Sequence, residues 1–170
     1  MTLLDFATLF DTYYPKLYAF IRSRVIDQKT AEDITASTFE RAFSRSHTYD
    51  PDKGAFSTWL FSIARNLIVN HYAAAERQPA QFDLDEMTDL AASTLSPEAQ
   101  LVRQEQQRQL LDLLNILSER DQEILQLRFF GHLTNRHIAT MLDLNEKTVS
   151  VIILRALRKL KMQLEQQESV

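Results

Sequence analysis

Cationic and polar side chains recur on one face of the segment 146–165, near the end of the chain. Helical spacing of about 100° per residue gathers them together; they are Lys147, Thr148, Val151, Arg155 and Arg158. Arginine can reach a DNA phosphate or a guanine edge, and an outward valine can contact a thymine methyl group in the major groove. The chemistry that this face predicts is therefore nucleic-acid recognition.

The elements that would position this face are two short helices joined by a tight turn. We expect helices over about 134–142 and 146–165, with Thr134 and Asn145 as N-caps, a turn at 143–145 and a small-residue contact at Ala139. This is the helix-turn-helix arrangement, whose second helix enters the major groove. The apolar face of the second helix should be Val149, Ile153, Ala156, Leu160 and Leu164, flanked by Ile152 and Leu157. An amphipathic helix with a solvated cationic face is the competing interpretation, which the caps and the basic tail disfavour.

Helical periodicity of apolar residues extends over most of the remaining chain. We expect further helices over residues 3–14, 15–26 (restarted at Pro15), 30–43 (capped by Thr30), 55–75, 97–117 and 119–130 (capped by Ser118 and ended by Gly131). Trp59, Ile63 and Ala64 should lie in the core. With only 2 glycines among 170 residues and 45% apolar residues, the fold class is predicted to be all-α.

Composition also argues against several classes of protein. The chain has no cysteine, which excludes disulfides and thiolate metal sites. Its 4 histidines show no metal-ligand spacing and its 2 glycines cannot form a phosphate loop, so we expect no enzyme, no metal and no cofactor. No signal peptide or membrane-spanning segment is evident, which predicts a cytoplasmic protein.

The charge is unevenly distributed and predicts a division into domains. Residues 1–75 carry 8 cationic and 8 anionic residues, residues 76–105 carry 2 and 7, and residues 106–170 carry 9 and 8. Periodicity is lost over 76–97, so we expect two helical domains, 1–75 and 98–170, joined by an acidic linker at 76–97. Since neither domain is strongly basic, DNA binding by the chain alone should be weak.

Both domains contain motifs of one family. "LSERDQEILQLRFF", "LTNRHIATMLDLNEKTVS" and "RALRKLK" resemble region 4 of the extracytoplasmic-function (ECF) sigma factors of the sigma-70 family, and "AEDITASTFERAF" and "FSTWLFSIARNLI" resemble region 2. The resemblance covers nearly the whole chain. It implies a transcription initiation factor that binds core RNA polymerase and directs it to promoters. Region 2 would open the minus-ten element, and region 4 would read the minus-thirty-five element.

The resemblance also implies three sets of site residues. The minus-thirty-five contacts would be Lys147, Thr148, Ser150, Val151, Arg155 and Arg158. The minus-ten contacts would be Tyr49, Asp50, Lys53, Phe56, Thr58 and Asn66. The polymerase contacts would be Glu32, Asp33, Ala36, Ser37, Phe39 and Arg41. The implied partners are the clamp helices and flap of core polymerase, promoter DNA and an anti-sigma protein, with no membrane and no small-molecule substrate.

Some positions depart from the family pattern and keep alternatives open. The family often has Gln and Glu where Ala36 and Ser37 stand, and basic residues where Ser150 and Ile152 stand. A stand-alone helix-turn-helix regulator, which would need a symmetric dimer, and a sigma mimic that titrates an anti-sigma protein are the other hypotheses. The acidic linker suits a nucleic-acid mimic inside the polymerase channel and equally suits a merely soluble strap.

Overall fold

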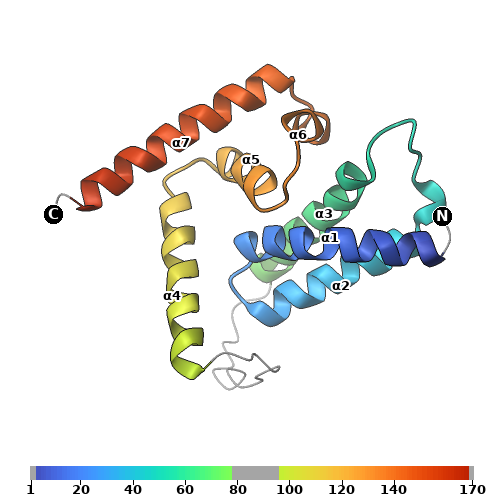
Figure 1. Cartoon of the computed structure of the whole chain (residues 1–170), viewed down its shortest axis with the longest axis horizontal. Coiled ribbons are helices and arrows are strands. Elements are labelled where there is room, and N and C mark those ends of the chain that lie inside the picture. Colours follow the sequence, from blue (N-terminus) through green and yellow to red (C-terminus); the bar gives the residue numbers. More distant parts are fainter. Residues whose placement is uncertain (1–2, 78–95, 169–170) are drawn as a thin grey trace.

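The computed structural model describes residues 3–77 and 96–168, and every regular element among them is helical (Figure 1). The first half contains α1 (Leu3–Arg24), α2 (Gln28–Ser44), the single 3-10 turn η1 (Ser46–Thr48) and α3 (Phe56–Arg77). The second half contains α4 (Pro97–Leu114), α5 (Glu119–Phe129), α6 (Asn135–Leu142) and α7 (Glu146–Glu168). The all-α prediction is confirmed for these residues.

Helices α1, α2 and α3 pack together into the N-terminal domain (Figure 1). Its center is formed by side chains with no exposed surface, including Leu17, Phe20, Ile21, Leu60 and Phe61. Removing each such side chain from water contributes roughly 1.5–3 kcal/mol. Ala64 is buried as expected, and Trp59 and Ile63 are half-buried against this core.

Helix α1 runs without interruption through Pro15, so the expected restart there was wrong. Proline removes one backbone hydrogen bond and would normally break a helix. Here apolar residues on both sides of it, such as Leu9 and Leu17, belong to the same core, and their packing holds the two halves in one helix.

The N-cap of α2 is Asp27 rather than Thr30, which corrects a second expectation. The Asp27 carboxylate accepts hydrogen bonds from the Thr30 backbone N–H (2.7 Å) and from the Thr30 hydroxyl (2.6 Å). These bonds from Thr30 hold the pKa of the Asp27 carboxyl below its usual value. Threonine therefore acts as a donor inside the first turn, and the helix begins three residues earlier than predicted.

The caps predicted in the C-terminal domain are confirmed. Ser118, Thr134 and Asn145 each accept a hydrogen bond from a backbone N–H of the first turn of α5, α6 and α7. Asp143 ends α6 in the left-handed conformation (φ 53°, ψ 51°), which an aspartate tolerates well. Helix α5 ends at Phe129, just before Gly131.

The apolar face of α7 is narrower than predicted. Val149, Ile152 and Ala156 are buried and Ile153 is half-buried, but Leu157 and Leu164 are exposed, which corrects that part of the prediction. The reason is that α7 extends past the end of α5, so its last turns have only α4 beside them (Figure 1).

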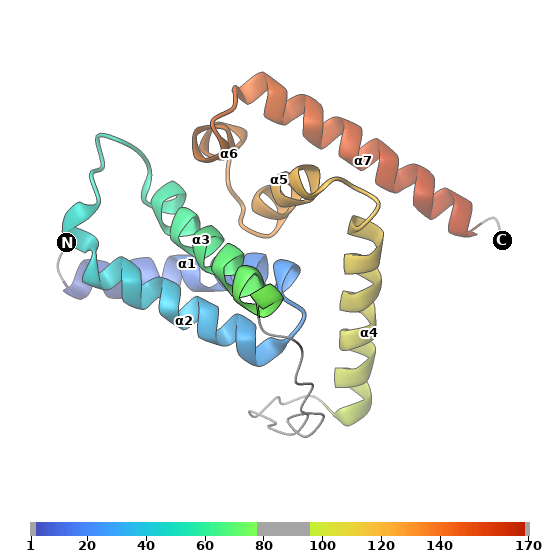
Figure 2. The same ribbon diagram turned by 180° about the vertical axis from the view of Figure 1, so that it is seen from behind.

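The two domains contact each other along α1 and α3 on one side and α5 and α6 on the other. Figures 1 and 2 show the same contact from opposite sides. Apolar residues of both domains, among them Phe61, Ile124 and Leu127, form one continuous buried cluster. The predicted linker at 76–97 lies mainly outside the described residues. No described helix has the length and apolar character that crossing a membrane requires.

Candidate nucleic-acid and polymerase interfaces

An open groove lies along the first turns of α7, where the sequence predicts DNA recognition. Its lining residues are Arg120, Asn145, Lys147, Thr148, Val151, Ile152 and Arg155. Val151 is 63% exposed even though Ile152 beside it is buried. The outward valine and the inward isoleucine follow from the helical wheel, so the apolar run "VSVII" in this helix supplies both a core face and a reading face.

Arg155 is held over this groove by a carboxylate of α5. Its Nη2 atom lies 3.2 Å from Oδ1 and 3.0 Å from Oδ2 of Asp121. The arginine side chain is 64% exposed and the aspartate side chain only 13%. One nitrogen of Arg155 is therefore anchored, while most of the guanidinium remains open to solvent.

The remaining residues of the predicted reading face are arranged differently from one another. Lys147 and Arg158 are exposed and Thr148 is half-buried. The Ser150 hydroxyl accepts a hydrogen bond from Asn135 Nδ2 (2.9 Å) and donates one to the Glu146 carbonyl (3.0 Å). Ser150 thus links α6 to α7 as well as facing outward.

Arg120 was missed by the sequence interpretation, although it lines the same groove. It lies in the first turn of α5 between Glu119 and Asp121, and because of these two acidic neighbors the sequence does not indicate a cationic surface there. No local signal identifies it, because its place at the groove depends on α5 packing beside α7.

Two of the predicted minus-ten residues, Tyr49 and Phe56, belong to an aromatic cluster at the start of α3. Tyr49 packs against Phe56 (ring centroids 5.4 Å apart) and Trp59 (5.3 Å), and its hydroxyl donates to the Gly54 carbonyl (3.2 Å). Burial raises the pKa of the Tyr49 hydroxyl above its ordinary value. Phe56 is a buried core residue that packs against Tyr49, and its contact with DNA stays a prediction.

The polar members of this set lie in the loop before α3 and on α3 itself. Asp50 accepts a hydrogen bond from the Asp52 N–H (3.0 Å) and lies 3.5 Å from Lys53 Nζ, which is largely exposed. Thr58 is half-buried and Asn66 is exposed, both on α3. The loop and the first turns of α3 therefore combine an aromatic platform with hydrogen-bonding groups, the two components that single-strand binding uses.

The predicted polymerase-facing residues occupy α2, and five of the six keep accessible side chains. Asp33, Ala36 and Arg41 are exposed, and Glu32 and Ser37 are half-buried. Phe39 is only 4% exposed and packs against Phe6, Phe10 and Tyr14 of α1. Phe39 thus fixes α2 to α1, and its contact with polymerase stays a prediction.

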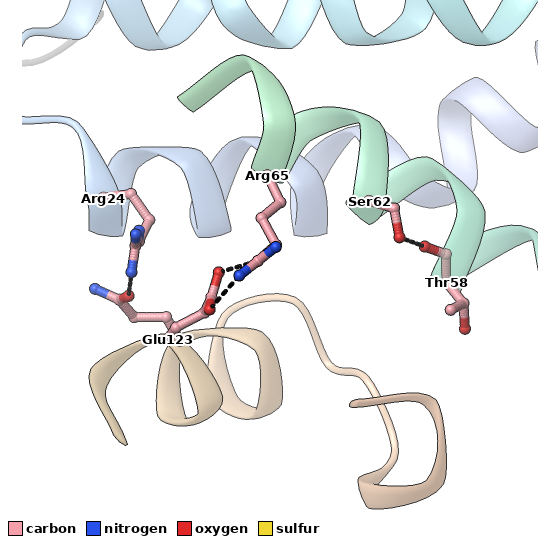
Figure 3. Close-up of polar contacts among 6 residues, drawn as sticks. Arg24, Thr58, Ser62, Arg65 and Glu123 are labelled. Carbon is pink, nitrogen blue, oxygen red and sulfur yellow. Dashed lines mark hydrogen bonds and ion pairs between the residues drawn. The ribbon is translucent and has the colours of Figure 1, made fainter. Parts of the chain in front are cut away.

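A polar contact between the two domains was not predicted at all. Arg65 Nε of α3 donates to Glu123 Oε1 of α5 (2.7 Å), and Nη2 lies 3.3 Å from Oε2 (Figure 3). Nearby, Gln126 Nε2 donates to the Ser23 carbonyl (2.8 Å), and its Oε1 accepts from Arg24 Nη1 (3.2 Å). A Glu and a Gln three residues apart in a helix indicate a polar face, but nothing in the sequence indicates which residues it meets.

Nothing in the described part of the chain groups three or more His, Asp or Glu side chains in a way that could hold a metal ion. What the geometry does provide is a helix-turn-helix with an exposed cationic groove, and a separate aromatic and polar surface on a second helical domain. This combination is typical of DNA-binding proteins with two helical domains.

Comparison with known proteins identifies the family. Residues 9–78 match the family model for sigma-70 region 2, and residues 113–162 match that for sigma-70 region 4. The sigma-H factor of Pseudomonas aeruginosa is 30% identical over 85% of this chain and 78% of its own length. The ECF sigma factors BldN of Streptomyces coelicolor and SigX of Bacillus subtilis are 34% and 27% identical over 91% and 94% of this chain. The chain spans 58% of the length of BldN and 84% of that of SigX.

Two solved structures share the fold. CnrH, in complex with the cytosolic domain of CnrY, aligns with a TM-score of 0.71 at 22% identity, over 97% of this chain and 90% of CnrH. RpoE of Bartonella quintana, in complex with the anti-sigma factor NepR, aligns with a TM-score of 0.67 at 20% identity, over 95% and 97%. The chain belongs to the ECF sigma factors of the sigma-70 family, which are transcription initiation factors.

Proposed function

We propose that this chain joins core RNA polymerase in the cytoplasm and directs it to promoters, with a division of labor between its two domains. The N-terminal domain, residues 1–75, binds the polymerase clamp helices through α2 and opens the minus-ten element. The C-terminal domain, residues 98–170, sits on the polymerase flap and reads the minus-thirty-five element. Residues 76–97 connect them.

The observation that carries this proposal is the order of the two family matches, region 2 before region 4, on a chain whose α7 exposes a cationic groove. The groove contains three cations, Arg120, Lys147 and Arg155, and one of these is already paired with Asp121. So few free charges give weak electrostatic attraction to a duplex. Tethering two weak DNA-binding surfaces on one polymerase raises their effective concentration and compensates for this.

In the minus-thirty-five complex, α7 enters the major groove with Val151 and Arg155 toward the bases. Lys147, Thr148, Ser150, Arg158 and Arg120 contact the backbone or neighboring bases around them. In the minus-ten complex, a flipped base stacks near Tyr49, and Asp50, Lys53, Thr58 and Asn66 supply hydrogen bonds. The rings of Tyr49 and Trp59 pack together, and Asp50 follows Tyr49 directly in the loop before α3, which supports this assignment.

An anti-sigma protein is the proposed regulatory partner, because the solved relatives CnrH and RpoE were each captured with a second protein, CnrY and the anti-sigma factor NepR. Such a protein would compete with polymerase or DNA for these surfaces.

The test is reconstitution of the chain with core polymerase, followed by size-exclusion chromatography and transcription from a library of promoter fragments. We expect co-elution and transcripts that depend on both promoter elements. DNA binding without polymerase association would favor the stand-alone regulator, and neither activity would favor the sigma mimic.

A further inference from the structure

One face of α5 is buried against the N-terminal domain. It consists of Glu123, Ile124, Gln126 and Leu127. Two of these residues are polar, and the Gln126 side chain is only 2% exposed. Buried polar groups need hydrogen-bond partners, and these two side chains bond to groups of the other domain: Arg65, Arg24 and the Ser23 carbonyl. These hydrogen bonds make the contact between the two domains a specific interface.

The contact with α5 lies on one face of α3, and this face begins near the predicted minus-ten residues. Thr58, Ser62 and Arg65 are spaced by four and three residues and so share one face of the helix. Figure 3 shows Arg65 pointing to Glu123 on this side, with Ser62 and Thr58 nearer the N-terminal end of α3. Helix α3 also contacts α6. The C-terminal domain therefore lies beside the face of α3 that carries Thr58 and Arg65, while Lys53 and Asn66 of the predicted minus-ten set stay exposed.

Promoter geometry requires these domains to separate. The names of the two elements place them about 25 base pairs apart, or about 85 Å of B-form DNA at ~3.4 Å per base pair. A compact chain of this length has a radius of gyration of only about 15 Å. Domains joined by a 2.7 Å ion pair cannot reach both elements, so the closed arrangement and the promoter-bound arrangement exclude each other.

Arg65 has a second property that connects this contact to DNA. Among the 22 residues of α3 it is the one Lys or Arg before the terminal Arg77, and it precedes Asn66 directly. The Glu123 carboxylate engages it with two oxygens, and a fork of this kind binds a phosphate in the same way. In the closed state, Glu123 therefore occupies the position that a backbone phosphate would take.

We propose that Arg65 contacts the backbone of the melted minus-ten strand, and that Glu123 of α5 occupies Arg65 in a closed state which must open before the strand binds. Helix α5 and the promoter strand thus compete for one guanidinium group. This inference rests on the proposed function, because it assigns Arg65 to the same minus-ten surface.

Closure is measured on the free chain by energy transfer between two dyes. The chain contains no cysteine, so Ala7→Cys on α1 and Thr140→Cys on α6, both exposed positions, can be labeled selectively. We expect high transfer for the parent chain. Glu123→Gln should raise the open-to-closed ratio about tenfold, because breaking one side of a mostly buried ion pair leaves the other unpaired. Glu119→Gln, an exposed carboxylate on the same helix, should leave transfer unchanged.

DNA contact is measured separately, with the holoenzyme and a fluorescent forked promoter whose minus-ten element is single-stranded. Arg65→Gln should weaken binding about fivefold and reduce the slope of log affinity against log salt by about 0.7, the value for one single-strand phosphate. Glu123→Gln should leave holoenzyme binding unchanged, since polymerase already separates the domains. In the free chain, the same substitution should increase binding of the strand.

The charge-swapped variant Arg65→Glu/Glu123→Arg distinguishes the two roles of Arg65. It should restore high energy transfer but not strand binding. If Glu123→Gln transfers as efficiently as the parent, or if Arg65→Gln keeps the full salt slope, the inference is overturned. A parent holoenzyme without promoter-dependent transcripts contradicts the proposed function instead, and the dye measurement on the free chain still decides whether the closed state exists.

Discussion

Replacing Arg155 by alanine should impair promoter reading without affecting polymerase binding. The residue lies over the groove of α7 with most of its guanidinium exposed. A well-placed arginine contact to a base edge contributes about 1–3 kcal/mol of discrimination, and 1.4 kcal/mol corresponds to tenfold. We therefore expect transcription from promoters that depend on the upstream element to fall by roughly 5-fold to 150-fold in Arg155→Ala.

The folded domain should lose little in the same variant. Exposed ion pairs contribute about 0–1 kcal/mol, so loss of the pair with Asp121 should lower the melting temperature by no more than about 8 °C. Asp121→Ala breaks the same pair but keeps the arginine, and it should retain most promoter use. Lys161→Ala removes an equal charge further along α7, beyond the groove, and serves as the matched control.

The assay is transcription by holoenzymes assembled with each variant, on templates with the upstream element intact or scrambled, alongside co-elution with core polymerase. The reasoning is refuted if Arg155→Ala loses polymerase association, because the groove would then be a protein-binding surface. It is equally refuted if Lys161→Ala and Arg155→Ala reduce upstream-dependent transcription to the same extent.

Four further substitutions test single positions. A Cβ at Gly131 would lie 2.7 Å from Phe61 Cε1 and 2.8 Å from the Leu127 carbonyl, so Gly131→Ala should destabilise the protein by about 1–3 kcal/mol in denaturant unfolding. Gly54→Ala meets no atom within 4 Å and should change stability by less than about 0.5 kcal/mol. Asp27→Ala should lower the free energy of unfolding by about 1 kcal/mol. Bonds from Thr30 lower the pKa of the Asp27 carboxyl, so the stabilisation by this cap is fully present above the ordinary Asp pKa of ~3.9. Thermal melting should show that this stabilisation is lost as the pH falls through the lowered pKa. Arg120→Ala should weaken holoenzyme binding to many upstream sequences alike and reduce the salt slope by about 0.9; a sequence-specific loss would argue against a phosphate contact.

Local features of the fold could be predicted from the sequence because they depend on neighboring residues. Ser118, Thr134 and Asn145 were found as caps since each lies directly before a helical apolar pattern. The error at Thr30 arose from the same rule, because Asp27 three residues earlier is an equally good acceptor. At Pro15, packing on a shared core outweighed a local helix-breaking preference.

The site was predictable to a different extent on its two surfaces. On α7 the helical wheel placed Val151 and Arg155 outward because a single helix determines both faces. Phe39 and Phe56 were predicted as contacts and the structure buries both, because the sequence alone does not distinguish an aromatic contact from an aromatic core residue. The sequence could not predict the pair Arg65–Glu123, because its members are 58 residues apart and their meeting depends on how two domains pack.

The most direct test of the account is promoter-dependent transcription by core polymerase with and without the purified chain, in parallel with duplex binding by the chain alone at physiological salt. The account predicts transcripts only when the chain is present, only from templates with both promoter elements, and weak duplex binding without polymerase. Nanomolar, sequence-specific duplex binding by the chain alone, with no effect on polymerase, would contradict it.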